Sequence, residues 1–171
     1  MIPLRLGDIA TITGGELVDG AEPDTIVSGP VEFDSRNVSE GSLFVCLPGA
    51  RVDGHDFAGI AVEQGAVACL EGHRTGQPGI LVDNSDTAEL SDSASSYVLE
   101  ADTTGEGQAV ITALSKLARA HTKIAVSEYG LTVIGVTGSA GKTSTKDLIA
   151  SVLRQAGETV APPGSFNNEL G

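Results

Sequence analysis

A lysine and a threonine follow a turn of small residues at positions 137 to 143, in the order Thr-Gly-Ser-Ala-Gly-Lys-Thr. Glycines let backbone N–H groups approach an anion closely, and the N-terminus of a helix adds partial positive charge. The amine of Lys142 could then reach the β- and γ-phosphates of a nucleotide, and the hydroxyl of Thr143 could bind Mg²⁺. The strict phosphate-loop pattern has glycine at position 136, where this chain has Val136. The residues therefore predict a variant ATP loop, with an incidental lysine in a tight turn as the alternative.

Polar side chains also follow two apolar, strand-like runs earlier in the chain. Ser35 and Arg36 come after the first run, and Asp53, Gly54 and His55 come after the second. Parallel strands bring their carboxyl ends to one edge of a sheet, where α/β domains place ligand sites. Ser35 and Arg36 carry groups that can bond a pyrimidine edge or a phosphate. Ordinary turns and a helix cap at the aspartates explain the same spacing equally well.

Two elements must position the lysine-threonine pair. Residues 131–136 are rich in β-branched side chains, which predicts a strand buried on both faces. A helix should begin at Lys142 and end near Gly157, which is placed to adopt a left-handed conformation. Its apolar side chains are spaced to form one stripe facing a sheet: Leu148, Ile149, Val152, Leu153 and Ala156.

The residues before this loop alternate between helical patterns and short apolar runs, which predicts an α/β domain with some parallel pairing. We expect strands at 26–34, 43–47, 66–70 and 79–82, and helices at 7–13, 56–65 and 108–122. Residues 84–96 form an acidic insertion with the composition of a solvated loop. The helix at 108–122 should link a first domain, residues 1–125, to a second that begins at 126 and includes residues through 171.

Three segments of the chain resemble the Mur ligase family, the ATP-dependent amide ligases that build the peptide stem of bacterial cell-wall precursors. They are Val-Thr-Gly-Ser-Ala-Gly-Lys-Thr-Ser-Thr-Lys at 136–146, Ser-Phe-Asn-Asn-Glu-Leu-Gly at 165–171, and DSRNVSEGSLFVCLPGARVDGHDF at 34–57. The loop is most similar to the MurF branch. The MurE branch usually has a Thr-Asn pair in the loop and an Asn-Thr pair downstream, and neither is present here.

The resemblance implies an α/β substrate-binding domain followed by the start of a P-loop parallel-sheet ATPase domain. It also implies a ligase that joins D-alanyl-D-alanine to UDP-N-acetylmuramoyl-tripeptide through an acyl phosphate, with ATP and Mg²⁺. The nucleotide would bind Thr137, Gly138, Ser139, Ala140, Gly141, Lys142, Thr143 and Ser144, with Lys142 catalytic and Thr143 on the metal. The substrate would bind Ser35, Arg36, Arg51, Asp53, Gly54, His55, Asn167 and Asn168.

The alternatives are a MurE-type ligase, which adds the third stem residue, a noncatalytic UDP-sugar or nucleotide-binding module, and another P-loop NTPase. Val136 disfavours the last of these. A P-loop domain needs several more strands and a further carboxylate, so we expect these 171 residues to be part of a longer enzyme and inactive by themselves.

The composition of the chain argues against some classes of binding partner. A net charge of −13 argues against nonspecific binding to nucleic acid or to an anionic membrane. The sequence shows neither a signal-peptide core nor an apolar run long enough to span a membrane, which predicts a cytoplasmic protein. Cys46 and Cys69 lie in apolar runs and are expected to be small buried hydrophobes in a reducing compartment. We expect a monomer.

Overall fold

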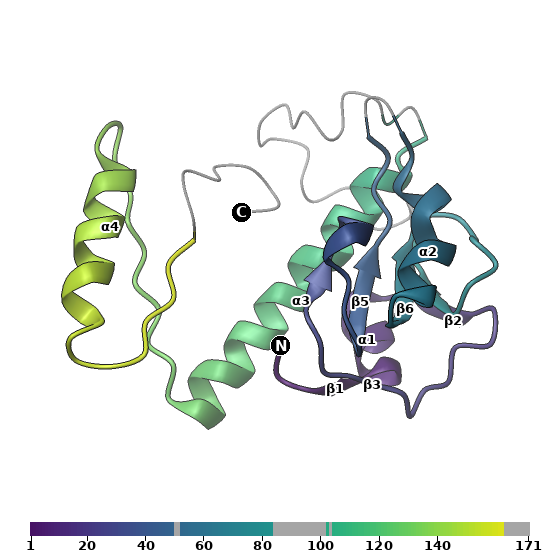
Figure 1. Ribbon diagram of the computed structural model, residues 1–171, viewed down its shortest axis with the longest axis horizontal. Helices are drawn as coiled ribbons and strands as arrows, with labels where there is room; N and C mark the ends of the chain where they lie inside the picture. Colours follow the sequence, from purple (N-terminus) through teal and green to yellow (C-terminus); the bar gives the residue numbers. More distant parts are fainter. Residues whose placement is uncertain (50–51, 84–101, 103, 163–171) are drawn as a thin grey trace.

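The computed structural model describes residues 1–49, 52–83, 102 and 104–162 (Figure 1). Its first part is built on a five-stranded sheet with the order β2-β7-β6-β5-β4. The strands are β2 (Glu16–Val18), β4 (Val31–Glu32), β5 (Ser42–Val45), β6 (Ala66–Glu71) and β7 (Gly79–Leu81). The four strands from β4 to β7 are parallel, and β2 pairs with β7 in the antiparallel direction. The carboxyl ends of the parallel strands therefore share one edge of the sheet.

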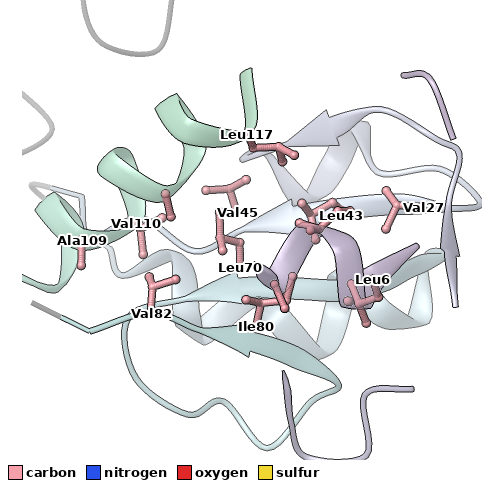
Figure 2. Close-up of a cluster of buried hydrophobic side chains, with 14 residues drawn as sticks. Leu6, Val27, Leu43, Val45, Leu70, Ile80, Val82, Ala109, Val110 and Leu117 are labelled. Atoms are coloured by element: carbon pink, nitrogen blue, oxygen red, sulfur yellow. The ribbon is translucent and has the colours of Figure 1, made fainter. Parts of the chain in front are cut away.

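Helices cover both faces of this sheet. Alternate side chains of β5 and β6 point to opposite faces, as the period of a strand requires. On one face Leu43, Val45 and Leu70 pack with side chains of α1 (Leu6–Thr13) and α3 (Glu106–Tyr129), as Figure 2 shows. On the other face Phe44, Cys46 and Cys69 pack against α2 (Ala58–Glu63). Both cysteines are buried free thiols, as predicted.

The predicted strand at 26–34 is wrong in extent, because the chain forms two short strands there. β3 (Ile26–Val27) pairs with β1 (Leu4–Arg5) in a separate antiparallel ribbon, and β4 joins the main sheet. Ser28, Gly29 and Pro30 separate the two strands. A Cβ on Gly29 would lie 2.7 Å from backbone atoms of residues 40–42, so this close crossing of two segments requires glycine. The sequence analysis did not predict β2.

Helix α3 is longer than predicted and runs from Glu106 to Tyr129. Gly105 precedes it and Gly130 follows it, both in the left-handed conformation. The predicted domain boundary at 125/126 therefore lies within the last turns of a continuous helix. No helix in the described parts of the chain is both long and apolar enough to cross a membrane.

The region after α3 differs most from the prediction. Residues 131–136 form no strand, and Leu131, Val133 and Ile134 are about half exposed or more. A strand needs a neighbour for its backbone hydrogen bonds, and no described strand pairs with this segment. Helix α4 (Lys142–Leu153) begins at the predicted residue and stands apart from the sheet in Figure 1.

The end and the apolar stripe of α4 also depart from the prediction. The helix ends at Leu153, and Gly157 is not left-handed because the chain leaves the helix through short turns before reaching it. Leu148 and Val152 are each about 70 % exposed, since no described sheet lies against them.

Candidate functional site

Two short 3₁₀ helices place the predicted first-domain residues at the carboxyl edge of the sheet. Ser35–Asn37 follows β4, and Gly54–Phe57 follows β5. Because β4 and β5 are parallel neighbours, both segments lie at the same edge, and α2 contacts both. The structure thus brings Ser35 and Arg36 to the same edge as Asp53, Gly54 and His55. Arg51, Asn167 and Asn168 lie outside the described residues.

Arg36 is held by the aspartate that begins its own turn. Asp34 accepts the backbone N–H of Arg36 at 3.0 Å, and it accepts Nε and Nη2 of the guanidinium at 2.8 and 2.6 Å. These bonds to Arg36 lower the pKa of Asp34 to about 2. The arginine side chain is 85 % exposed, so the pair presents an oriented guanidinium to solvent.

His55 is the most buried of the predicted site residues, with a side chain only 3 % exposed. The backbone N–H of Gly72 donates to its Nε2 at 3.1 Å, and Nδ1 lies 2.6 Å from Asp53 Oδ1. Because Nε2 accepts a hydrogen bond, the proton of the neutral ring must be on Nδ1, where it is donated to Asp53. Both ring nitrogens are therefore engaged in hydrogen bonds within the protein.

The loop that contains Arg51 is closed at its base by short-range contacts. Pro48 and Asp53 form an isolated antiparallel bridge, and Gly49 N–H donates to Val52 O at 3.0 Å. Gly54 N–H donates to Leu47 O at 2.9 Å, and a Cβ on Gly54 would lie 2.6 to 2.7 Å from the backbone of Leu47. Glycine at position 54 therefore permits the chain to double back against the end of β5.

The sequence analysis missed two residues at this edge, His73 and Glu106. The rings of His55 and His73 stack with centroids 3.8 Å apart and an interplanar angle of 18°. His73 Nδ1 lies 2.9 Å from Glu106 Oε2, which belongs to the first residue of α3. The available signal was position, because His73 follows the end of β6 as His55 follows the end of β5.

Asp53, His55 and His73 have ligand atoms within 4.8 Å of one another, which is the proximity of a metal site. The chemistry of the donors does not fit one. Both nitrogens of His55 are already hydrogen-bonded, and the in-plane lone pairs of two stacked rings run side by side. Tetrahedral coordination requires lone pairs that converge on one point. Asp53 and His55 are therefore joined by hydrogen bonds, and His73 stacks on the His55 ring.

One acidic side chain behind this edge is fully buried. Glu71, the last residue of β6, accepts Thr75 N–H at 3.2 Å and Thr75 Oγ1–H at 2.7 Å, both on Oε2. Its Oε1 has no hydrogen-bond partner among the residues that the structure describes. Burial raises the pKa of Glu71, and the nearby charge of Asp19 adds to this against the lowering effect of Thr75.

The predicted phosphate loop precedes α4. Gly138 and Gly141 have φ values of 155° and 76°, and the helix begins at Lys142. The Lys142 amine folds back over the loop and donates to Gly138 O at 2.6 Å. The first N–H groups of a helix have no acceptor within it, and the Thr143 hydroxyl lies in this first turn. An amine, a hydroxyl and amide N–H groups are a donor set that suits a nucleotide phosphate with Mg²⁺.

Comparison with known proteins identifies similar chains for both parts. The family models described as "Mur ligase family, catalytic domain" and "Mur ligase middle domain" match residues 30–104 and 136–171. The UDP-N-acetylmuramoyl-tripeptide–D-alanyl-D-alanine ligases of Mycobacterium leprae and Mycobacterium tuberculosis are each 51 % identical over all of this chain and 33 % of their own length. A 2,6-diaminopimelate ligase of Syntrophomonas wolfei is 35 % identical over 91 % of the chain and 27 % of its own.

A solved structure supports the fold independently. The crystal structure of MurF from Acinetobacter baumannii matches 98 % of this chain and 31 % of that one, with a TM-score of 0.70 and 24 % identity. The chain thus spans about a third of the length of the curated relatives with which it aligns throughout.

Proposed function

Because this chain belongs to the Mur ligase family, we propose that it supplies the nucleotide-sugar-binding domain and the ATP loop of a ligase. That ligase joins D-alanyl-D-alanine to UDP-N-acetylmuramoyl-tripeptide. Residues 1–125 form the substrate domain, and the ATPase domain begins at 126. The enzyme acts in the cytoplasm as a monomer.

The observation that carries this proposal is the 51 % identity to ligases of that name across the whole chain. The diaminopimelate-adding relatives are 35 to 36 % identical over 89 to 91 % of the chain. This difference favours the D-alanyl-D-alanine ligase over the MurE-type alternative.

The first-domain edge suits the nucleotide half of the substrate. A guanidinium has five N–H donors, and Asp34 engages only Nε and Nη2 of Arg36. Arg36 therefore keeps capacity to pair with a diphosphate while Asp34 holds its orientation. Ser35, Pro48 and Asp53 lie at the same edge and would contact the uridine and the sugar.

The loop that precedes α4 suits the triphosphate group of a nucleotide. ATP with Mg²⁺ would activate the carboxylate of the peptide stem when bound. Lys142 would exchange its bond to Gly138 O for phosphate oxygens, Thr143 would hold the metal, and residues 137–141 with Ser144 would surround the phosphates. Preorganised positive groups at such positions stabilise the charge that develops during phosphoryl transfer.

Calorimetric titration of the chain with UDP-N-acetylmuramoyl-tripeptide tests the proposal. We expect saturable binding that Arg36→Ala weakens by about tenfold to a hundredfold, the range for a hydrogen bond to a charged group. Arg119→Ala on the exposed surface of α3 is the matched control and should bind as the unmodified chain does. Absence of binding by a folded chain, or equal loss in both variants, would contradict the assignment of this edge.

A further inference from the structure

We propose that the stacked His55–His73 pair is a positioning device for the base of the substrate loop. It holds in place the Pro48–Asp53 bridge that closes this loop. This inference rests on the proposed function, because it concerns the same nucleotide-sugar site. Neither histidine is placed against the ligand, so both act through the loop.

The first step is the link that His55 makes between the segment after β5 and the segment after β6. Its Nδ1–H is donated to Asp53 at the base of the loop, and its Nε2 accepts Gly72 N–H just beyond β6. Asp53 also accepts the backbone N–H of His55 at 2.9 Å. The imidazole therefore attaches the loop base to a neighbouring strand through one buried ring.

The second step is the dependence of the loop on Asp53. The Pro48–Asp53 bridge closes the loop, and the Gly54 backbone packs tightly against Leu47 immediately after it. Gly107 of α3 also lies close to Pro48, since a Cβ there would be 2.6 Å from its Cγ. A shift of the Asp53 carboxylate would therefore move the closing bridge of the loop.

The third step is the cover that His73 provides. Its ring lies against that of His55 at 3.8 Å, and its Nδ1 is tied to Glu106 at 2.9 Å. Gly72 and Glu106 approach so closely that a Cβ on Gly72 would lie 2.7 Å from Glu106 Cβ. The start of α3 thus fixes His73, and His73 in turn keeps His55 buried and its two hydrogen bonds intact.

The test uses calorimetric titration of the 171-residue chain with UDP-N-acetylmuramoyl-tripeptide at pH 7.5. We expect His73→Ala to weaken binding at pH 7.5 by about tenfold, which matches an aromatic pair of about 1.4 kcal/mol. His73→Phe should stay within about threefold of the unmodified chain, because a phenyl ring restores the stack.

The third histidine, His121, is the matched control, because its Nε2 accepts Ile2 N–H far from the loop. His121→Phe should bind the nucleotide sugar as the unmodified chain does. Affinity unchanged in His73→Ala, equal losses in His73→Ala and His73→Phe, or binding that EDTA abolishes would each overturn the proposal. EDTA sensitivity would mean that a metal ion organises the loop.

Nitrogen NMR of the imidazole rings tests the device without any ligand. The His55 ring should show the Nδ1–H tautomer, and in His73→Ala the amide of Gly72 should exchange with solvent at least about tenfold faster. Unchanged exchange would overturn the inference. If the unmodified chain fails to bind the nucleotide sugar, the proposed function fails, and the NMR result still decides whether the histidine pair positions the loop.

Discussion

Asp34 and Asp53 each shape a turn that carries a neighbouring side chain to the edge of the sheet. Each accepts the backbone N–H two residues ahead, at 3.0 and 2.9 Å, and so begins a 3₁₀ turn. The turn explanation from sequence is therefore correct, and the same turns carry Arg36 and His55 to the edge of the sheet. Asp56 does not cap α2, since Phe57 is the N-cap and no side-chain cap is formed there.

Glu71 leads to a prediction about stability and pH. Burial raises its pKa, so the neutral acid is the form that the fold prefers. The stability that depends on this proton is fully present below the unfolded pKa and is lost as pH rises through the folded pKa. Glu71→Gln keeps an acceptor for Thr75 and removes the buried charge. At pH 8 we expect the free energy of unfolding of Glu71→Gln to exceed that of the unmodified chain by about 1 kcal/mol.

Urea unfolding at pH 4 and pH 8 measures this effect. The difference between Glu71→Gln and the unmodified chain should be small at pH 4 and grow toward pH 8. Glu63→Gln, on the exposed end of α2, is the control and should change neither value. A glutamine variant that is less stable at pH 8 would show that Glu71 is ionised and stabilised in the fold.

Among the elements, the parallel strands and their helices were predictable because their apolar runs are buried in the part of the chain described. The sequence analysis missed β2 because a strand of three residues is too short to show the alternation of apolar and polar side chains. The strand at 131–136 failed for the opposite reason, since its apolar pattern is clear and its pairing partner is absent from the described sheets. His73 and Glu106, separated by 33 residues, meet only because β6 and α3 end at the same edge.

The turn after β5 gives a prediction about packing. Gly54→Ala would press a methyl group against the N and O atoms of Leu47 at 2.6 to 2.7 Å, and backbone atoms cannot rotate away. We expect a loss of about 2 kcal/mol in the free energy of unfolding, the usual cost of such overpacking. Gly59→Ala in α2 is the control, because only the Gln77 side chain lies near, at 4.0 Å. Chemical denaturation should find Gly59→Ala neutral or stabilising.

The phosphate loop gives a prediction about nucleotide binding. Lys142→Ala removes the amine that folds over the loop, and we expect the affinity for Mg²⁺–ATP to fall about tenfold to a hundredfold. Lys123→Ala removes an exposed lysine of α3 and should leave the affinity unchanged. Titration of the chain with Mg²⁺–ATP compares them. Equal affinity in both variants would remove Lys142 from the site.

On the scale of the whole molecule, burial is uneven. The core around β5, β6, α1 and α3 contains many side chains that are fully excluded from solvent, whereas Ala150 is the one buried residue of α4. Segments with few buried contacts open locally at low free energy. We therefore expect α4 to have a lower local stability than the core around β5, β6, α1 and α3.

Amide hydrogen exchange measures that difference. We expect the amides of α4 to exchange at least about a hundredfold faster than those of β6, because opening α4 exposes little apolar surface. The middle of α3, around Val110 and Ile111, is an internal reference and should match β6. Equal protection in α4 and β6 would mean that both parts unfold as one cooperative unit.

The uninterrupted course of α3 has a mechanical consequence. A helix of 24 residues is about 36 Å long, and this one begins beside the histidine pair and ends at Gly130, just before the segment that leads to the ATP loop. A tilt of about 10° at its base would swing the far end through about 6 Å over that length. Small tilts at the start of the helix, beside the histidine pair, therefore become displacements of several ångströms at Gly130.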